Sequence, residues 1–209
     1  MTTADRDSLR RELTVRTLQL MADRGAMIGK SELAADARMS RARMDELFPE
    51  ESDLFDAVVE HWYADDVAIM EEVIASSLPV QRKFYEFFVR RFRIERERFR
   101  RDPALFALCV ELGTDRFEQV RGYIDLADHY LSVLIAEAQA EGHFPGLSIG
   151  RALTMINQMV VCYTSPQLLM IVGDRLDEDK LACIIDTLFA GLAGGDRGAI
   201  GVTGLRAAS

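Results

Sequence analysis

Apolar residues along the chain recur every three to four positions, and strand-like alternation is nowhere sustained. This periodicity places apolar side chains on one face of successive helices, so the sequence predicts an all-α fold with about nine helices. The five prolines lie between the periodic segments, where helices begin or end: Pro49, Pro79, Pro103, Pro145 and Pro166.

Four helices are expected in the first third of the chain. The first ends at Gly25, which suits a left-handed C-cap. A short helix from about Lys30 to Ala37 is followed by a tight turn at Arg38 and Met39. Ser40 is a good N-cap for a third helix, "RARMDELF", which Pro49 ends. Ser52 or Asp53 is expected to cap a long fourth helix.

The rest of the chain predicts a helical body. Helices are expected at about 80–101, 103–112, 148–165 and 178–192, with a long amphipathic helix before Gly142. The helices at 148–165 and 178–192 are apolar on most faces, so we expect them to pack against a second copy of the chain as a homodimer. The predicted organisation is a DNA-binding domain at 1–52, a ligand-binding and dimerisation domain at 53–194, and a disordered tail at 195–209.

Composition excludes several classes of protein. The net charge of −9 disfavours a non-specific nucleic-acid coat, and the imbalance lies in the body, since residues 1–52 carry only −1. No apolar run approaches the roughly 20 residues of a membrane span, and no secretory signal is visible, so a cytoplasmic protein without membrane contact is expected.

Motifs for metal sites, cofactors and catalysis are absent from the sequence. Cys109, Cys162 and Cys183 lack the spacing of a disulfide framework or zinc site and are expected to be small buried hydrophobes. The three histidines are scattered, and neither a P-loop nor a nucleophile motif occurs. We therefore expect no metal, no cofactor and no enzymatic activity.

The second and third helices, with the turn between them, have the order of a helix-turn-helix. The second helix of such a pair fits the major groove of DNA, which is about 12 Å wide. Met44, Leu47 and Phe48 are expected to pack inward, so that side chains between them point outward. The candidate DNA-binding residues are Lys30, Ser31, Arg38, Ser40, Arg41, Arg43 and Asp45.

The chain resembles the TetR/AcrR family of bacterial transcriptional regulators. The resemblance begins at "LTVRTLQLMADRG", continues through "LAADARMSRARMDELFPEESDLFDAVVEHW", and ends at "LFAGLA". It implies a homodimer whose two DNA-binding domains read a near-palindromic double-stranded operator. It also implies repression that a small ligand relieves.

This chain departs from the family pattern by placing acids where DNA phosphates should lie. The family usually has Tyr at the position of Asp45 and Lys near Glu51, and Lys30 replaces a usual apolar residue. An acid at such a site repels phosphate, yet Asp45 can also accept a hydrogen bond from cytosine N4. Glu50 and Glu51 also suit the start of the next helix. Two interpretations stay open: a working DNA-binding domain with unusual preference, or a helical dimeric small-molecule or protein-binding module with weak or lost DNA binding.

The body is expected to bind a small, largely apolar ligand between helices, where pockets are mostly apolar with a few polar groups. Each candidate residue has plain core packing or dimer contact as its alternative. The candidates are Trp62, Phe84, Phe88, Cys109, Tyr123, His129, Tyr130, Met155, Gln158, Met159 and Tyr163.

An arginine-rich run at 90–101, "RRFRIERERFRR", is expected to be a solvated helix end rather than a nucleic-acid patch. Glu95 and Glu97 are interleaved with the arginines, and the spacing predicts ion pairs from Arg91 to Glu95 and from Glu97 to Arg101.

Overall fold

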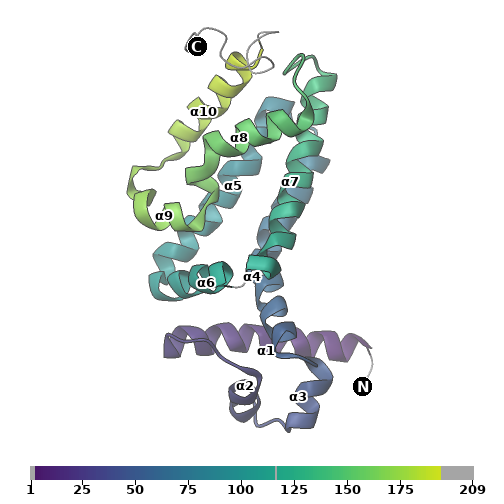
Figure 1. Cartoon of the computed structure of the whole chain (residues 1–209), viewed down its shortest axis with the longest axis vertical. Helices are drawn as coiled ribbons and strands as arrows, with labels where there is room; N and C mark the ends of the chain where they lie inside the picture. Colours follow the sequence, from purple (N-terminus) through teal and green to yellow (C-terminus); the bar gives the residue numbers. More distant parts are fainter. Residues whose placement is uncertain (1–2, 116, 194–209) are drawn as a thin grey trace, which may run out of the picture. The chain divides into compact units, whose positions relative to one another are not determined.

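α-Helices form the framework of the chain in the computed structural model, which describes residues 3–115 and 117–193 (Figure 1). One turn of 3-10 helix, Gly173–Arg175, follows the ninth helix. The helices are α1 (Thr3–Arg24), α2 (Lys30–Asp36), α3 (Arg41–Leu47), α4 (Glu51–Ala75), α5 (Val80–Arg101), α6 (Pro103–Asp115), α7 (Phe117–Ala140), α8 (Ile149–Thr164), α9 (Pro166–Val172) and α10 (Glu178–Gly191). The predicted all-helical fold class is confirmed. The predicted tail at 195–209 lies outside the described residues.

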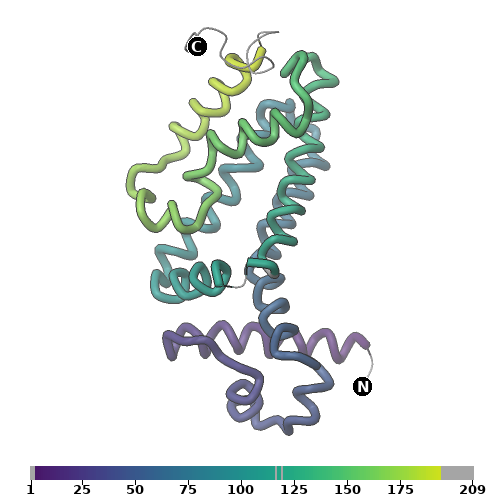
Figure 2. Tube along the Cα trace, viewed as in Figure 1, coloured from purple at the N-terminus to yellow at the C-terminus, as the bar shows by residue number. Residues whose placement is uncertain are grey.

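Helix α9 raises the number of described helices to ten, where about nine were predicted. It begins with Pro166 at its first turn, and the Ser165 Oγ accepts a hydrogen bond from the Leu168 N–H at 3.3 Å. A helix of seven residues is too short to display the helical period clearly, so the sequence showed only a proline at an element edge. Figure 2 follows the trace from α8 through α9 and back along α10.

The start of α4 also differs from the prediction. The helix begins at Glu51, so Ser52 and Asp53 lie inside its first turn and neither is the N-cap. Asp53 still serves the helix end, because its Oδ2 accepts a hydrogen bond from the Glu50 N–H at 2.7 Å. This is the backward half of a capping box, in which an acid of the first turn bonds the backbone before the helix.

Contacts divide the chain into two compact units, and α4, α5 and α7 each contribute residues to both. The first unit comprises residues 1–65 and 98–123. Its core joins α1 to α4 through fully buried side chains such as Met21, Leu33, Leu47 and Phe48. Apolar residues of α6, including Cys109, pack against this cluster. This core, which also includes Leu54 and Ala57 of α4, fixes α2 and α3. Residues 1–52 are called the head below.

The second unit comprises residues 66–97 and 124–209 and has an aromatic core in its described part. Phe84 is fully buried and meets the rings of Phe144 and Phe189 edge-on, with centroids 6.0 and 5.2 Å away. Lys83 is also buried, and its Nζ lies 2.7 Å from Glu137 Oε1 and 3.2 Å from the Ile74 carbonyl oxygen. This charge ties α5 to α7 and to the end of α4.

The arginine run of α5 is only in part the solvated helix end that was predicted. Arg93, Arg100 and Arg101 are exposed, but two other arginines of the run are nearly buried. Arg91 and Arg98 have side chains only 12% and 11% exposed. Arg91 pairs with the buried Asp66 at 3.6 Å within the second unit. Arg98 pairs with Asp65 at 3.6 Å and lies over the Trp62 ring within the first. The acids belong to α4, so rules for pairs within one helix could not find them.

The cysteines were predicted to be buried, but Cys183 is exposed and Cys109 and Cys162 are half-buried. Cys183 occupies the outer side of α10, which the periodicity alone had treated as buried. Among the described helices, no single one is long and apolar enough to cross a membrane; α8 and the α9 segment pass that test only as a pair, with a bend of 53° between them.

Candidate nucleic-acid interface

Helices α2 and α3 are joined by a turn of four residues, 37–40, whose geometry follows from its sequence. Arg38 adopts φ 52°, in the left-handed region, and the Met39 N–H donates to the Ala34 carbonyl at 2.8 Å. Ser40 then has extended backbone, and its Oγ accepts a hydrogen bond from the Arg43 N–H at 3.3 Å. The predicted turn and N-cap are confirmed, so α3 is held at a defined start relative to α2.

Burial of the inner side of α3 fixes which residues it presents outward. Met44, Leu47 and Phe48 are at most 2% exposed, as predicted. Arg41, at the first position of α3, has a side chain 92% exposed. Ser31, Arg38 and Ser40 are exposed as well.

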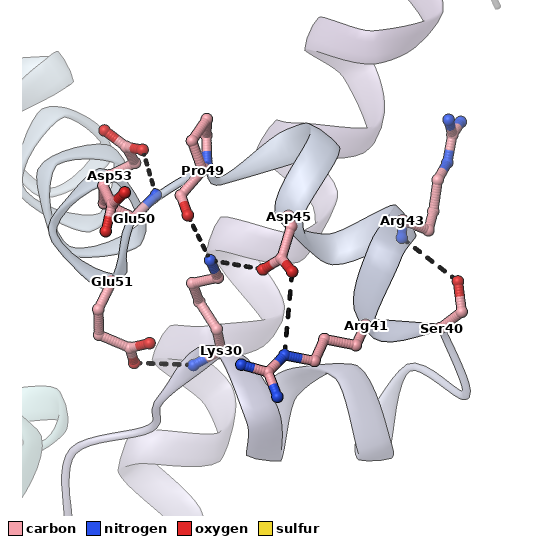
Figure 3. Close-up of polar contacts among 9 residues, drawn as sticks. All are labelled: Lys30, Ser40, Arg41, Arg43, Asp45, Pro49, Glu50, Glu51 and Asp53. Carbon is pink, nitrogen blue, oxygen red and sulfur yellow. Dashed lines mark hydrogen bonds and ion pairs between the residues drawn. The ribbon is translucent and has the colours of Figure 1, made fainter.

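Lys30 is a central member of a polar network that links α2 to α3 (Figure 3). Its Nζ lies 2.7 Å from Asp45 Oδ1 and donates to the Pro49 carbonyl at 2.8 Å, and its side chain is only 12% exposed. Asp45 Oδ2 lies 3.9 Å from Arg41 Nε. The hydrogen bond from Lys30, together with the charges of Lys30 and Arg41, lowers the pKa of Asp45 below its ordinary value. Asp45 is therefore ionised, and the positive charges of Lys30 and Arg41 balance its negative charge.

Glu51 bonds the start of α2 rather than projecting only to solvent. Its Oε1 accepts a hydrogen bond from the Lys30 backbone N–H at 2.8 Å (Figure 3). Glu32 provides a second acid at this helix end, with Oε2 accepting from the Gly29 N–H at 3.2 Å. Negative charge is stabilising at a helix N-terminus. A DNA phosphate cannot use the Lys30 amide while Glu51 holds it.

Gly29 allows this approach of Glu51. A Cβ at position 29 would lie 2.7 Å from Glu51 Oε1, which is closer than Cβ contacts in proteins. The small residue before α2 and the acid at the start of α4 therefore belong to one arrangement.

Glu46 has its own partner, because its Oε2 lies 2.6 Å from Arg43 Nη1. Its backbone carbonyl accepts a hydrogen bond from Arg6 of α1 at 2.8 Å. Asp45, Glu46 and Glu51 thus all have cationic or N–H partners within the head. Asp45 and Glu51, which the sequence placed against phosphate, are therefore bonded within the helix-turn-helix. Arg41 has the most exposed charged side chain of α3, at 92%, against 62% for Glu46.

Sequence reasoning missed two contributors that hold α3 in place. The first is Pro49, whose carbonyl oxygen accepts a hydrogen bond from Lys30 Nζ. Arg10 of α1 donates from Nη1 to the Leu47 carbonyl and from Nη2 to the Asp53 carbonyl, both at 3.3 Å, and its guanidinium lies 4.9 Å from the Phe48 ring centroid. Arg10 therefore satisfies a carbonyl at the end of α3, where a cation suits the helix dipole. The partners are 37 or more residues apart, so no local pattern signals them.

The candidate ligand-binding residues divide between the two units. In the first unit, Trp62 packs on Phe106, Cys109 lies against the core, and Tyr123 stacks on Tyr63 with centroids 3.8 Å apart.

In the second unit, Phe84 and Phe88 are core residues, and Tyr163 is buried with its hydroxyl donating to the Asp177 carbonyl at 3.1 Å. Burial raises the pKa of that hydroxyl above its ordinary value. Tyr130 donates to Glu71 Oε1 at 3.0 Å and Met155 is half-buried.

Three of the candidates in the second unit are exposed, namely His129, Gln158 and Met159. As a group, the candidate ligand-binding residues stay predictions.

Comparison with known proteins identifies the family. A family model described as "Tetracyclin repressor-like, C-terminal domain" matches residues 80–185, half of the chain. The chain belongs to the TetR family of transcriptional regulators, as its sequence resemblance had indicated. The match covers the body, whereas the resemblance rested mainly on the head.

A solved structure, the fatty acid degradation regulator FadR from Bacillus halodurans, is similar in fold. Its TM-score is 0.56 at 17% sequence identity, over 90% of this chain and 96% of that chain. A comparison with curated proteins gives no match. The matched share includes residues of both the head and the body.

Proposed function

We propose that this TetR-family regulator binds a near-palindromic DNA operator as a homodimer and represses transcription until a small, largely apolar ligand releases it. The observation that carries the DNA-binding part is the helix-turn-helix of the head. Its second helix, α3, is capped by Ser40 and packs its inner side against the core. The Arg41 side chain on this helix is almost completely exposed. A helix presented in this way can enter the major groove, with its first residues at the base edges. We propose no catalysis and a cytoplasmic location.

The second unit supports the homodimer proposal through the outer sides of α8 and α10. Met159 of α8 is 43% exposed, and Met155 and Cys162, on the same side of that helix, are half-buried. On α10 the exposed residues Cys183, Thr187 and Ala190 are small and lie at helical spacing. Small residues allow close approach of a second helix pair, and exposed apolar side chains favour its burial.

Sedimentation should give twice the 23.5 kDa chain mass, and Met159→Lys should weaken the dimer. The surface variant Glu12→Lys on α1 is the matched control and should leave the mass unchanged. A monomeric wild-type protein would contradict the homodimer.

The DNA-binding proposal is tested by footprinting the purified protein on the DNA upstream of its own gene. We expect two protected half-sites about one helical turn apart, or a multiple of it, with two chains per operator. Arg41→Ala should weaken this footprint. No protection at concentrations that saturate other regulators of this class would contradict the proposal.

The alternative, a helical dimeric module with weak or lost DNA binding, has one specific observation in its favour. Lys30 and the first amide of α2 are engaged by Asp45 and Glu51, so two groups that could contact phosphate are already bonded. If this alternative holds, footprints will be absent while the dimer and any ligand affinity persist.

Ligand control is testable through reciprocity. A ligand that weakens DNA binding must bind the DNA complex more weakly by the same factor. A panel of long-chain acyl and aromatic compounds can be screened by thermal shift, and calorimetry with and without operator then measures the coupling. Equal ligand affinity in both states would refute release by that ligand.

A further inference from the structure

Asp45 and Arg41 lie one turn apart on α3 and face each other (Figure 3). The contact involves the inner edge of the guanidinium, with Arg41 Nε 3.9 Å from Asp45 Oδ2. A guanidinium has five N–H donors in a rigid plane, and only one of them belongs to Nε. The outer edge, with Nη1 and Nη2, points away from Asp45 and is the edge that bonds guanine O6 and N7 in pairs.

Lys30 fixes the other oxygen of the same carboxylate. Its Nζ lies 2.7 Å from Asp45 Oδ1 and is itself fixed by the Pro49 carbonyl at 2.8 Å. The carboxylate therefore has a cation on each oxygen and a defined orientation. Asp45 remains ionised over the physiological range, because these partners lower its pKa.

An exposed arginine without such a partner samples many rotamers. Ordering it against a base costs conformational entropy, which reduces the affinity gained from the bond. A neighbouring carboxylate that restricts the guanidinium reduces this cost.

From this geometry we propose that Asp45 is a positioning residue: it orients Arg41 so that Arg41 reads a guanine, while Lys30 holds Asp45 in place. The inference rests on the proposed DNA-binding function and differs from both earlier interpretations of the acid. Asp45 is then neither a reader of cytosine nor a source of repulsion toward DNA. Its effect on recognition passes through Arg41 and is confined to the base pair that Arg41 contacts.

The test is selection of bound sequences from a randomised duplex pool with full-length protein. We compare the wild type with four variants: Arg41→Ala, Asp45→Asn, Asp45→Glu, and the double variant that combines Arg41→Ala with Asp45→Asn. The duplexes that each protein selects are then titrated to measure its affinity. Glu12→Gln removes one carboxylate from an exposed site on α1 and controls for the change in net charge. Melting curves followed by circular dichroism verify that each variant is folded.

We expect Arg41→Ala to lose preference for guanine at one base pair, by roughly 5- to 100-fold. Asp45→Asn should lose preference at the same base pair, by roughly 2- to 5-fold. The double variant should match Arg41→Ala alone, because the two residues act as one unit. Asp45→Glu keeps a carboxylate and should restore part of the preference, whereas Glu12→Gln should match wild type.

Several outcomes would overturn the inference while leaving the proposed function intact. A loss at a different base pair would show that Asp45 reads a base itself. A uniform gain in affinity with Asp45→Asn, beyond that of Glu12→Gln, would show simple repulsion. Additive effects of the two substitutions would show that the residues act independently. Failure of the wild type to enrich any sequence would instead refute the DNA-binding proposal and the inference with it.

Discussion

Replacing Lys30 by Met tests whether this lysine supports the head or contacts DNA. The change keeps an unbranched apolar stem in a position only 12% exposed, and removes the ammonium that Asp45 and Pro49 share. Stem packing is largely retained, so the loss reports on the polar contacts.

The expected cost is about 1 kcal/mol in stability of the α2–α3 segment. A hydrogen bond to a charged group contributes about 1.5–3 kcal/mol where it is shielded from water. Pro49 is exposed, so water replaces part of this bond in the variant. The pair with Asp45 adds little, because exposed ion pairs contribute little to stability.

Hydrogen exchange of backbone amides in α2 and α3 measures this cost locally, and a loss of about 1 kcal/mol corresponds to about fivefold faster exchange. The slope of log affinity for DNA against log salt should stay unchanged. Arg38→Met is the matched control, because Arg38 is an exposed cation of the turn. It should reduce the slope by about 0.9 and leave exchange in α2 unchanged. A reduced slope with normal exchange in Lys30→Met would refute the reasoning.

Three further predictions follow from the contacts. Gly29→Ala should displace Glu51 Oε1, which lies 2.7 Å from the added Cβ, and should lower head stability by about 1 kcal/mol in thermal melts. In a Glu51→Ala background the same change should cost clearly less, because only the poorer N-cap preference of alanine remains. An equal cost in both backgrounds would contradict the bond from Glu51 to α2. Lys83→Met should lower the free energy of unfolding, measured in urea, by about 2–4 kcal/mol, because the Glu137 carboxylate loses its buried partner. An unchanged free energy of unfolding would show that water replaces the lysine ammonium. Stability should fall as the pH drops below about 4, because hydrogen-bonded ion pairs lower the pKa of Asp36 and of Asp45 in the folded state. The stability that these two carboxylates contribute is present above their unfolded-state pKa and is lost as the pH falls through their folded-state pKa. Asp36→Asn should therefore flatten the acid side of a plot of Tm against pH.

Local signals predicted the helix-turn-helix because its determinants are local. Gly25 has φ +61° at the end of α1, and Ser40 caps α3 as its position suggested. The aromatic spacing of α5 is local in the same way, and Phe84, Phe88 and Phe92, which recur every four residues, are buried. Each of these features depends on neighbours within about one turn, which a single sequence displays.

The polar network of the head could not be predicted because its members are far apart in sequence. Lys30 and Asp45 belong to different helices, and Glu51 reaches the Lys30 amide from 21 residues away. From the sequence alone these acids faced phosphate or solvent. One sign was present: a lysine at a position that is usually apolar in the family, followed at a distance by an acid in place of Tyr. A charge in a nearly buried position requires a partner, and Asp45 is that partner.

The central claim, that the head reads DNA, is tested most directly by measuring affinity for the selected duplex and for a random duplex at several salt concentrations. The account predicts much tighter binding to the selected duplex, by about a thousandfold or more, with affinity for both falling steeply as salt rises. Equal, weak binding to both duplexes that vanishes at modest salt would contradict it and would favour the alternative of a dimeric binding module.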